Sequence, residues 1–89
     1  MIGGVTRAEV AALVRLRAAQ LTGRDPTALP ADASFLGELG VDSLDFVEFV
    51  LALEDELGIE LPEHEMAGVS TPDQLAALAA SKLNPDGGR

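Results

Sequence analysis

The chain has 89 residues, no cysteine and a formal net charge of -9 at pH 7. A chain of this length forms one domain with little room for a deep catalytic cleft, and without cysteine it forms neither disulfides nor thiolate metal sites. No segment has the pattern of a signal peptide and the apolar runs are too short to span a bilayer, so we expect one soluble, cytoplasmic domain over residues 1–89.

The whole net charge arises in the second half of the chain. Up to Val41, four arginines balance four acidic residues, whereas from Asp42 onward eleven acidic residues face only Lys82 and Arg89. Such a field repels phosphate backbones and attracts basic protein surfaces. The sequence therefore argues against nucleic acid as a partner and favours a protein with a basic surface.

The first predicted helix starts at about Arg7 and ends before Gly23. Thr6 and Glu9 have the spacing of a capping box, which marks a helix start. Arg17 falls on the apolar face of this helix, so its side chain must snorkel to reach water. That apolar face consists of Val10, Leu13, Val14 and Leu21.

A long connection follows, over residues 22–40, and its prolines and glycines interrupt any regular element. We expect a short helical turn over residues 34–39 and apolar contacts that pin the connection onto the core. The residues expected to make those contacts are Leu29, Phe35, Leu36 and Leu39. A loop of this length in a compact domain is more often functional than idle.

The second predicted helix runs from Ser43 to Leu57, with Asp42 as its N-cap and Gly58 just beyond its end. At about 100° per residue, one face is apolar and must be the core side. The core face carries Phe46, Phe49, Val50, Leu53 and Leu57. The opposite face carries Asp45, Glu48, Ala52, Asp55 and Glu56, and one flank between the two carries Leu44, Val47 and Leu51.

The rest of the chain predicts one short helix and one longer helix. An extended link leads to residues 63–68, which can form at most a short helix, and the last helix should run from Pro72 to near Leu83, with Thr71 and Gln74 at its start. Residues 84–89 are expected to be a frayed tail. Because no strand pattern appears, we predict an all-α fold, a small bundle of three main helices and one short helix, with an ordered core over about residues 5–83.

The acidic pattern of the second helix breaks two local rules. Asp45 and Glu48 are like charges three residues apart, and the run from Glu54 to Glu56 opposes the helix dipole, each at a cost of a few tenths of a kcal/mol. A plain solvated face is the alternative. Rules broken without a local gain indicate function, and apolar residues edged by carboxylates suit docking to another protein.

Ser43 lies in the first turn of this helix, where unpaired N–H groups favour a phosphate group. The simpler alternative is that Asp42 and Ser43 only cap the helix. A catalytic serine needs a base, but the only histidine is His64 and no G-x-S-x-G motif is present. We therefore expect no catalytic residue and no enzyme activity. Since His64 has no second histidine to work with, we also expect no metal site.

Residues 39–45, L-G-V-D-S-L-D, followed by V-E-F-V-L-A-L-E-D-E-L-G-I-E-L-P, resemble the phosphopantetheine attachment motif and recognition helix of acyl carrier proteins. The segments A-S-F-L-G-E-L-G and T-P-D-Q-L also fall where that family has comparable segments. The resemblance implies a four-helix carrier in which Ser43 receives 4′-phosphopantetheine from coenzyme A. The terminal thiol of that arm then holds acyl groups as thioesters.

The same resemblance implies roles for the residues around Ser43. It places Asp42 and Leu44 beside the modified serine. The acidic residues that it implies as contacts to basic patches on partner enzymes are Asp45, Glu48, Glu54 and Asp55. The apolar contacts it implies are Leu44, Val47 and Leu51. A bound acyl chain could fold back between helices, although the bulk of Phe46 and Phe49 argues against deep sequestration.

The implied partners are a phosphopantetheinyl transferase and then acyltransferases, ketosynthases or acyl or aminoacyl ligases with basic docking patches. The order Gly40, Val41, Asp42 before the serine favours an acyl carrier over a peptidyl carrier. We expect a monomer in a polyketide, fatty-acid or mixed biosynthetic pathway. An aminoacyl cargo, and an acidic helical adaptor without a prosthetic group, stay open as alternatives.

Overall fold

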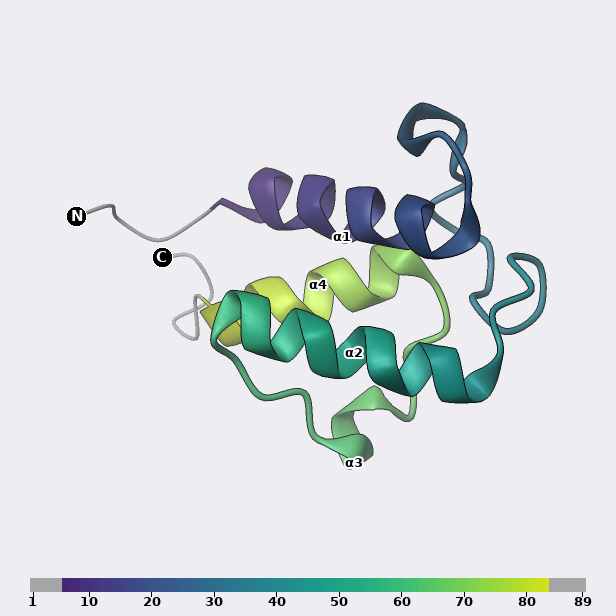
Figure 1. Ribbon diagram of the computed structural model, residues 1–89. Helices are drawn as coiled ribbons and strands as arrows, with labels where there is room; N and C mark the ends of the chain where they lie inside the picture. Colours follow the sequence, from purple (N-terminus) through teal and green to yellow (C-terminus); the bar gives the residue numbers. More distant parts are fainter. Residues whose placement is uncertain (1–5, 84–89) are drawn as a thin grey trace.

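The computed structural model describes residues 6–83, and within them every regular element is helical (Figure 1). The elements in chain order are α1 (Arg7–Thr22), a short 3-10 helix η1 (Pro26–Ala28), α2 (Ser43–Leu57), α3 (Glu63–Met66) and α4 (Pro72–Leu83). The predicted all-α bundle of three main helices and one short one is confirmed. The frayed tail expected over residues 84–89 lies outside the described residues.

The helix ends are set by the local capping groups that the sequence predicts. At the start of α1, Thr6 Oγ1 accepts a hydrogen bond from Glu9 N at 3.1 Å, and Glu9 Oε1 accepts one from Thr6 N at 2.8 Å. Gly23 and Gly58 follow α1 and α2 with φ values of 69° and 67°, a left-handed conformation that favours glycine. The predicted bounds of both helices are therefore confirmed.

The core lies between α1, α2 and α4 and also takes in part of the long loop before α2. In Figure 1, α1 and α4 lie side by side, and these two helices are in contact. The largest fully buried side chains come from all three helices and from that loop: Val10, Val14, Phe35, Leu53 and Leu75. None of the described residues that are buried is polar or charged, so hydrophobic burial supplies most of the stability of this small domain.

The long loop is fastened to the helices by backbone and side-chain hydrogen bonds. The guanidinium of Arg15 donates through Nη1 to Leu29 O at 2.7 Å and to Pro26 O at 3.2 Å. Farther along, Phe35 N donates to Ser70 O at 2.8 Å. The loop therefore has a defined position against α1 and against the segment that leads into α4.

One predicted core contact of this loop is wrong. Phe35 and Leu39 are buried, with 1% and 7% of their surface exposed, but the side chain of Leu36 is 55% exposed. The cause is the backbone, because residues 34–39 form a hydrogen-bonded turn rather than the expected helical turn, with Leu39 N donating to Ser34 O at 2.9 Å. This turn directs the side chain of Leu36 to solvent.

No helix within residues 6–83 combines the length and the apolar character needed to cross a membrane.

Candidate functional site

The start of α2 presents an exposed serine beside partly unpaired backbone N–H groups. Asp42 caps this helix, since its Oδ1 accepts a hydrogen bond from Leu44 N at 2.8 Å and its carbonyl oxygen accepts one from Phe46 N at 2.9 Å. Ser43 is the first helical residue and is exposed. In the first turn, the N–H groups of Ser43 and Asp45 have no helical carbonyl four residues earlier. This end of the helix therefore suits an anionic group such as phosphate.

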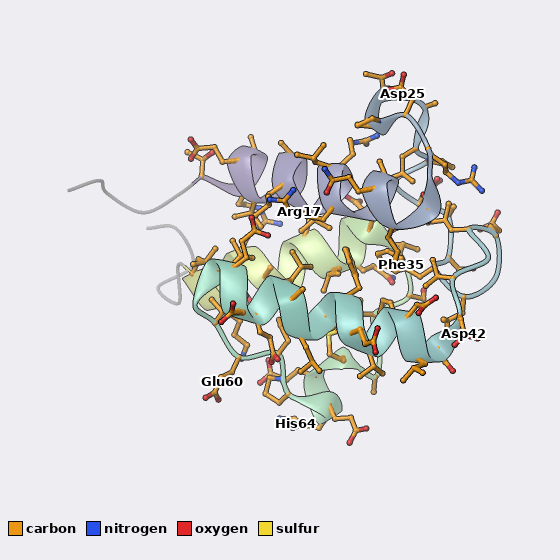
Figure 2. The ribbon with its side chains drawn as sticks, viewed as in Figure 1. Arg17, Asp25, Phe35, Asp42, Glu60 and His64 are labelled. Atoms are coloured by element: carbon orange, nitrogen blue, oxygen red, sulfur yellow. The ribbon has the colours of Figure 1, made fainter. Side chains whose placement is uncertain are left out.

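The position of this serine is fixed by the residues that precede it. Val41 N donates to Phe35 O at 2.7 Å, which ties the chain just before α2 to the preceding turn. The ring of Phe35 lies 4.9 Å from that of Phe46 and 5.6 Å from that of Phe49, centroid to centroid. In Figure 2, Phe35 lies among the helices, whereas Asp42 lies at the edge of the molecule where α2 begins. The exposed Ser43 therefore follows a segment that is fastened to the preceding turn and, through Phe35, to the core.

One face of α2 combines exposed apolar and acidic side chains. Leu44, Val47 and Leu51 are 64%, 53% and 57% exposed, as the helical projection predicted for this flank. Asp45, Glu48 and Asp55 are exposed on the same helix. We call these six residues the α2 face. Its apolar centre and carboxylate edge have the composition of a surface for a basic protein partner.

Two of the carboxylates near the end of α2 have partners within the fold. Glu54 is half-buried, and its Oε2 accepts a hydrogen bond from Leu61 N at 2.6 Å, which holds the link to α3. Glu56 pairs with Arg17 of α1, with Nη2 at 2.6 Å from Oε2 and Nε at 2.9 Å from Oε1. The sequence analysis missed both roles. These contacts stabilise the fold and so offset the unfavourable position of Glu54 and Glu56 near the negative end of the helix dipole.

The Arg17 side chain reaches Glu56 instead of merely snorkelling to water. Hydrogen bonding from Arg17, together with its positive charge, holds the pKa of the Glu56 carboxyl below its usual range. A carboxyl whose pKa is lowered by folding stabilises the protein above its ordinary pKa, and that stabilisation is lost as the pH falls through the lowered value. The ion pair therefore contributes at neutral pH and not in strong acid.

We accordingly expect Glu56→Gln to lower the melting temperature slightly at neutral pH and to match the wild type at acidic pH. The measurement is thermal unfolding followed by far-ultraviolet circular dichroism at several pH values. Asp55→Asn is the matched control, because it removes the same charge from the exposed neighbour of Glu56. If both variants show the same pH dependence, the Arg17 pair contributes nothing specific.

A shallow apolar groove of about 240 Å³ lies between α2 and α3. Its lining includes Phe46, Val50, Leu51, Leu61 and Met66. Glu65 of α3 forms an ion pair with Lys82 of α4, which holds the short helix in place. Phe49 does not line this groove, because its side chain is buried against Phe35. Of the two phenylalanines whose bulk argues against deep sequestration of an acyl chain, only Phe46 lines this groove.

The described residues contain no catalytic arrangement around Ser43. His64 lies on α3 with its side chain 80% exposed, and its nearest charged neighbour is Glu65 at 3.6 Å. Figure 2 shows His64 well apart from Asp42 at the start of α2. Within residues 6–83, no three histidine, cysteine or acidic side chains are grouped so that they could hold a metal ion.

Most of the chain is similar to known proteins. Residues 12–79 match the family described as "Phosphopantetheine attachment site". Over 60 residues, the chain is 40% identical to a protein from Bdellovibrio bacteriovorus described as "Acyl carrier protein", and the match covers 67% of this chain and 77% of that protein. The family match includes the long loop, all of α2 and α3, and most of α4.

Proposed function

Because the chain belongs to the acyl carrier protein family, whose members carry covalently attached 4′-phosphopantetheine, we propose that Ser43 is the attachment residue. The observation that supports this assignment is the exposure of Ser43 at the first position of α2, beside N–H groups that favour a phosphate. Asp42 and Leu44, on either side of Ser43, are the proposed contacts of the attached group. The side chains of both residues are exposed, as is that of Ser43.

Attachment is a phosphoryl transfer in which the chain supplies only the nucleophile. The Ser43 oxygen forms a bond to the phosphorus next to pantetheine, and the diphosphate bond of coenzyme A breaks. Adenosine bisphosphate leaves, and the serine proton passes to a base of the transferase. The acyl carrier protein is a carrier and not an enzyme, and no base for this step is needed on the chain itself.

The attached group supplies a terminal thiol on which acyl intermediates are held as thioesters. The chain would deliver these intermediates to partner enzymes of a polyketide, fatty-acid or mixed biosynthetic pathway. These partners include acyltransferases, ketosynthases and acyl or aminoacyl ligases. The acidic surface and the lack of cysteine are consistent with a cytoplasmic location and a monomer.

The α2 face is the proposed docking surface for these enzymes and for the transferase. Its exposed carboxylates attract a basic patch and speed association, while its three apolar side chains give modest affinity. Glu54 is also proposed as a partner contact, although one of its oxygens is already bonded to Leu61 N. Fast release matters because a carrier meets several enzymes in turn, and tethering raises the effective concentration of its cargo.

The attachment is tested by incubating the unmodified protein with coenzyme A, magnesium and a promiscuous phosphopantetheinyl transferase. We expect the intact mass to rise by one phosphopantetheine group, and we expect peptide mapping to locate the group on Ser43. A protein whose mass stays unchanged would contradict the proposed function.

The docking proposal predicts that Glu48→Lys slows loading by a partner acyltransferase about tenfold in kcat/KM without unfolding the protein. The reason is that the substitution places a like charge against the partner's basic patch. The measurement is the loading rate by intact mass at low and high salt, and the deficit should shrink at high salt because charges are then screened.

Glu60→Lys is the matched control for Glu48→Lys, because it makes the same charge change at an exposed residue. Figure 2 shows Glu60 at the far end of the molecule from Asp42. Equal rates for the two variants would mean that the loss reflects net charge and not the α2 face.

A further inference from the structure

Leu36 is an exposed apolar side chain that does not belong to the α2 face. Within residues 6–83, the exposed large apolar side chains are Leu16, Leu36, Leu44, Val47 and Leu51. Three of them lie on the α2 face and Leu16 lies on α1. Leu36 comes from the long loop and directly follows Phe35, which is buried. Its exposure therefore reflects the shape of the turn and not a lack of nearby core.

The turn that carries Leu36 is held by several hydrogen bonds. Ser34 Oγ accepts from Gly37 N at 3.1 Å and from Glu38 N at 3.0 Å, while Glu38 Oε1 accepts from Ser34 N at 3.1 Å. A Cβ atom on Gly37 would lie 2.5 Å from Ser34 Oγ, so only glycine fits there without a shift. Leu36 is thus presented by a closed turn and loses little conformational entropy of the backbone on binding.

The same turn places Leu36 close to Ser43. Phe35, which precedes Leu36, accepts a hydrogen bond from Val41 N at 2.7 Å, and Ser43 follows two residues later. From the spacing of Cα atoms along this path, Leu36 lies at most roughly 17 Å from Ser43. In Figure 1 this part of the loop lies beside the start of α2. A docked enzyme covers about 800 Å² of its partner, a patch roughly 30 Å across.

We propose that Leu36 is an apolar anchor for the phosphopantetheinyl transferase, and this inference rests on the proposed function of Ser43. The transferase must bring its active site to the Ser43 oxygen itself, so its footprint is centred there. Enzymes that act on the end of the attached arm do not have this constraint. The transferase would hold Leu36 in an apolar pocket with basic residues at its rim.

The charges around Leu36 support a partner of this kind. Glu38, Asp42 and Asp45 are all exposed on the loop and at the start of α2. Asp45 belongs to the α2 face, and Glu38 and Asp42 add exposed carboxylates in the chain between Leu36 and that face. A basic rim on the transferase would complement these carboxylates while its pocket takes the leucine.

The test measures the kinetics of attachment to the unmodified protein by intact mass, with purified transferase and coenzyme A in excess. We expect Leu36→Ala to raise the KM for the carrier about tenfold, because the contact of a leucine side chain is lost, and to leave kcat within about twofold. Leu36→Gln, which keeps the size of the side chain but makes it polar, should also raise KM. It serves as the second variant if the alanine variant has an altered circular dichroism spectrum.

Leu16→Ala is the control, because it removes a leucine that is 38% exposed on α1, and its KM should match the wild type. The inference is overturned if both Leu36 variants keep the wild-type KM while wild-type Ser43 is modified. It is also overturned if sedimentation shows a wild-type dimer that Leu36→Ala disperses, since a second copy would then cover Leu36. A wild type that is never modified would refute the proposed function itself.

Discussion

Replacing Ser43 with alanine is expected to abolish attachment of 4′-phosphopantetheine while leaving the fold intact. The serine hydroxyl is the only proposed nucleophile, and alanine cannot form the phosphoester. The helix start should survive, because the capping hydrogen bond to Leu44 N comes from Asp42 and the Ser43 side chain is exposed. The free energy of unfolding should therefore change by no more than about 0.5 kcal/mol.

Intact mass after incubation with coenzyme A and the transferase provides the measurement. Ser81→Ala is the control, since it removes an exposed serine hydroxyl from α4, and this variant should gain the same mass as the wild type. A mass gain on Ser43→Ala equal to that of the wild type would assign the attachment to another residue. The thermal unfolding curves of both variants should overlap that of the wild type.

The largest stability effect is expected for Phe35→Ala, at about 3–5 kcal/mol. The side chain is 1% exposed, and its ring packs against Phe46 and Phe49 of α2. Alanine would leave a cavity between the long loop and the helix that carries the proposed attachment residue. Because a domain of this size has only a few kcal/mol of stability, most molecules of the variant should be unfolded at room temperature.

Far-ultraviolet circular dichroism in water measures the unfolded fraction of this variant, and urea unfolding followed by the same signal measures the stability of the wild type, since the chain has neither tryptophan nor tyrosine for fluorescence. Leu36→Ala is the matched control because it truncates the next residue, which is exposed. Its free energy of unfolding should lie within about 0.5 kcal/mol of the wild-type value. If the two variants lose equal stability, Phe35 does not anchor the loop in the way its contacts indicate.

The helix bounds could be predicted because their signals are local. A capping box at Thr6, an aspartate before Ser43 and glycines at positions 23 and 58 each act within a few residues of the helix end they define. The core face of α2 follows from the helical period alone. The attachment motif is equally local, so the resemblance around Ser43 and the geometry of α2 point to the same residue.

The contacts that sequence analysis missed depend on how distant segments meet. Arg17 and Glu56 are 39 positions apart, and nothing in either helix shows that α1 passes the end of α2. The bond from Leu61 N to Glu54 requires the link after α2 to turn back along it. Each of these pairings becomes visible only when the helices are packed.

The exposure of Leu36 was missed for a different reason. Its apolar neighbours suggested burial, whereas the direction of its side chain is set by the Ser34 turn. The sequence does contain a signal, because Ser34 and Glu38 flank a glycine in the spacing of a local side-chain cap. That pattern predicts a closed turn more readily than it predicts which side chain faces solvent.

The turn between Ser34 and Val41 also limits where enzymes can act on this carrier. The hydrogen bond from Val41 N to Phe35 O fastens the chain just before Ser43, so with the arm attached to Ser43, as proposed, motion of the loop would add little to the region that a tethered acyl group explores. That region is then a sphere whose centre is fixed on the protein and whose radius is the length of the arm alone. Two active sites served from one docked position must both lie inside it, and any site beyond it requires release and a new encounter.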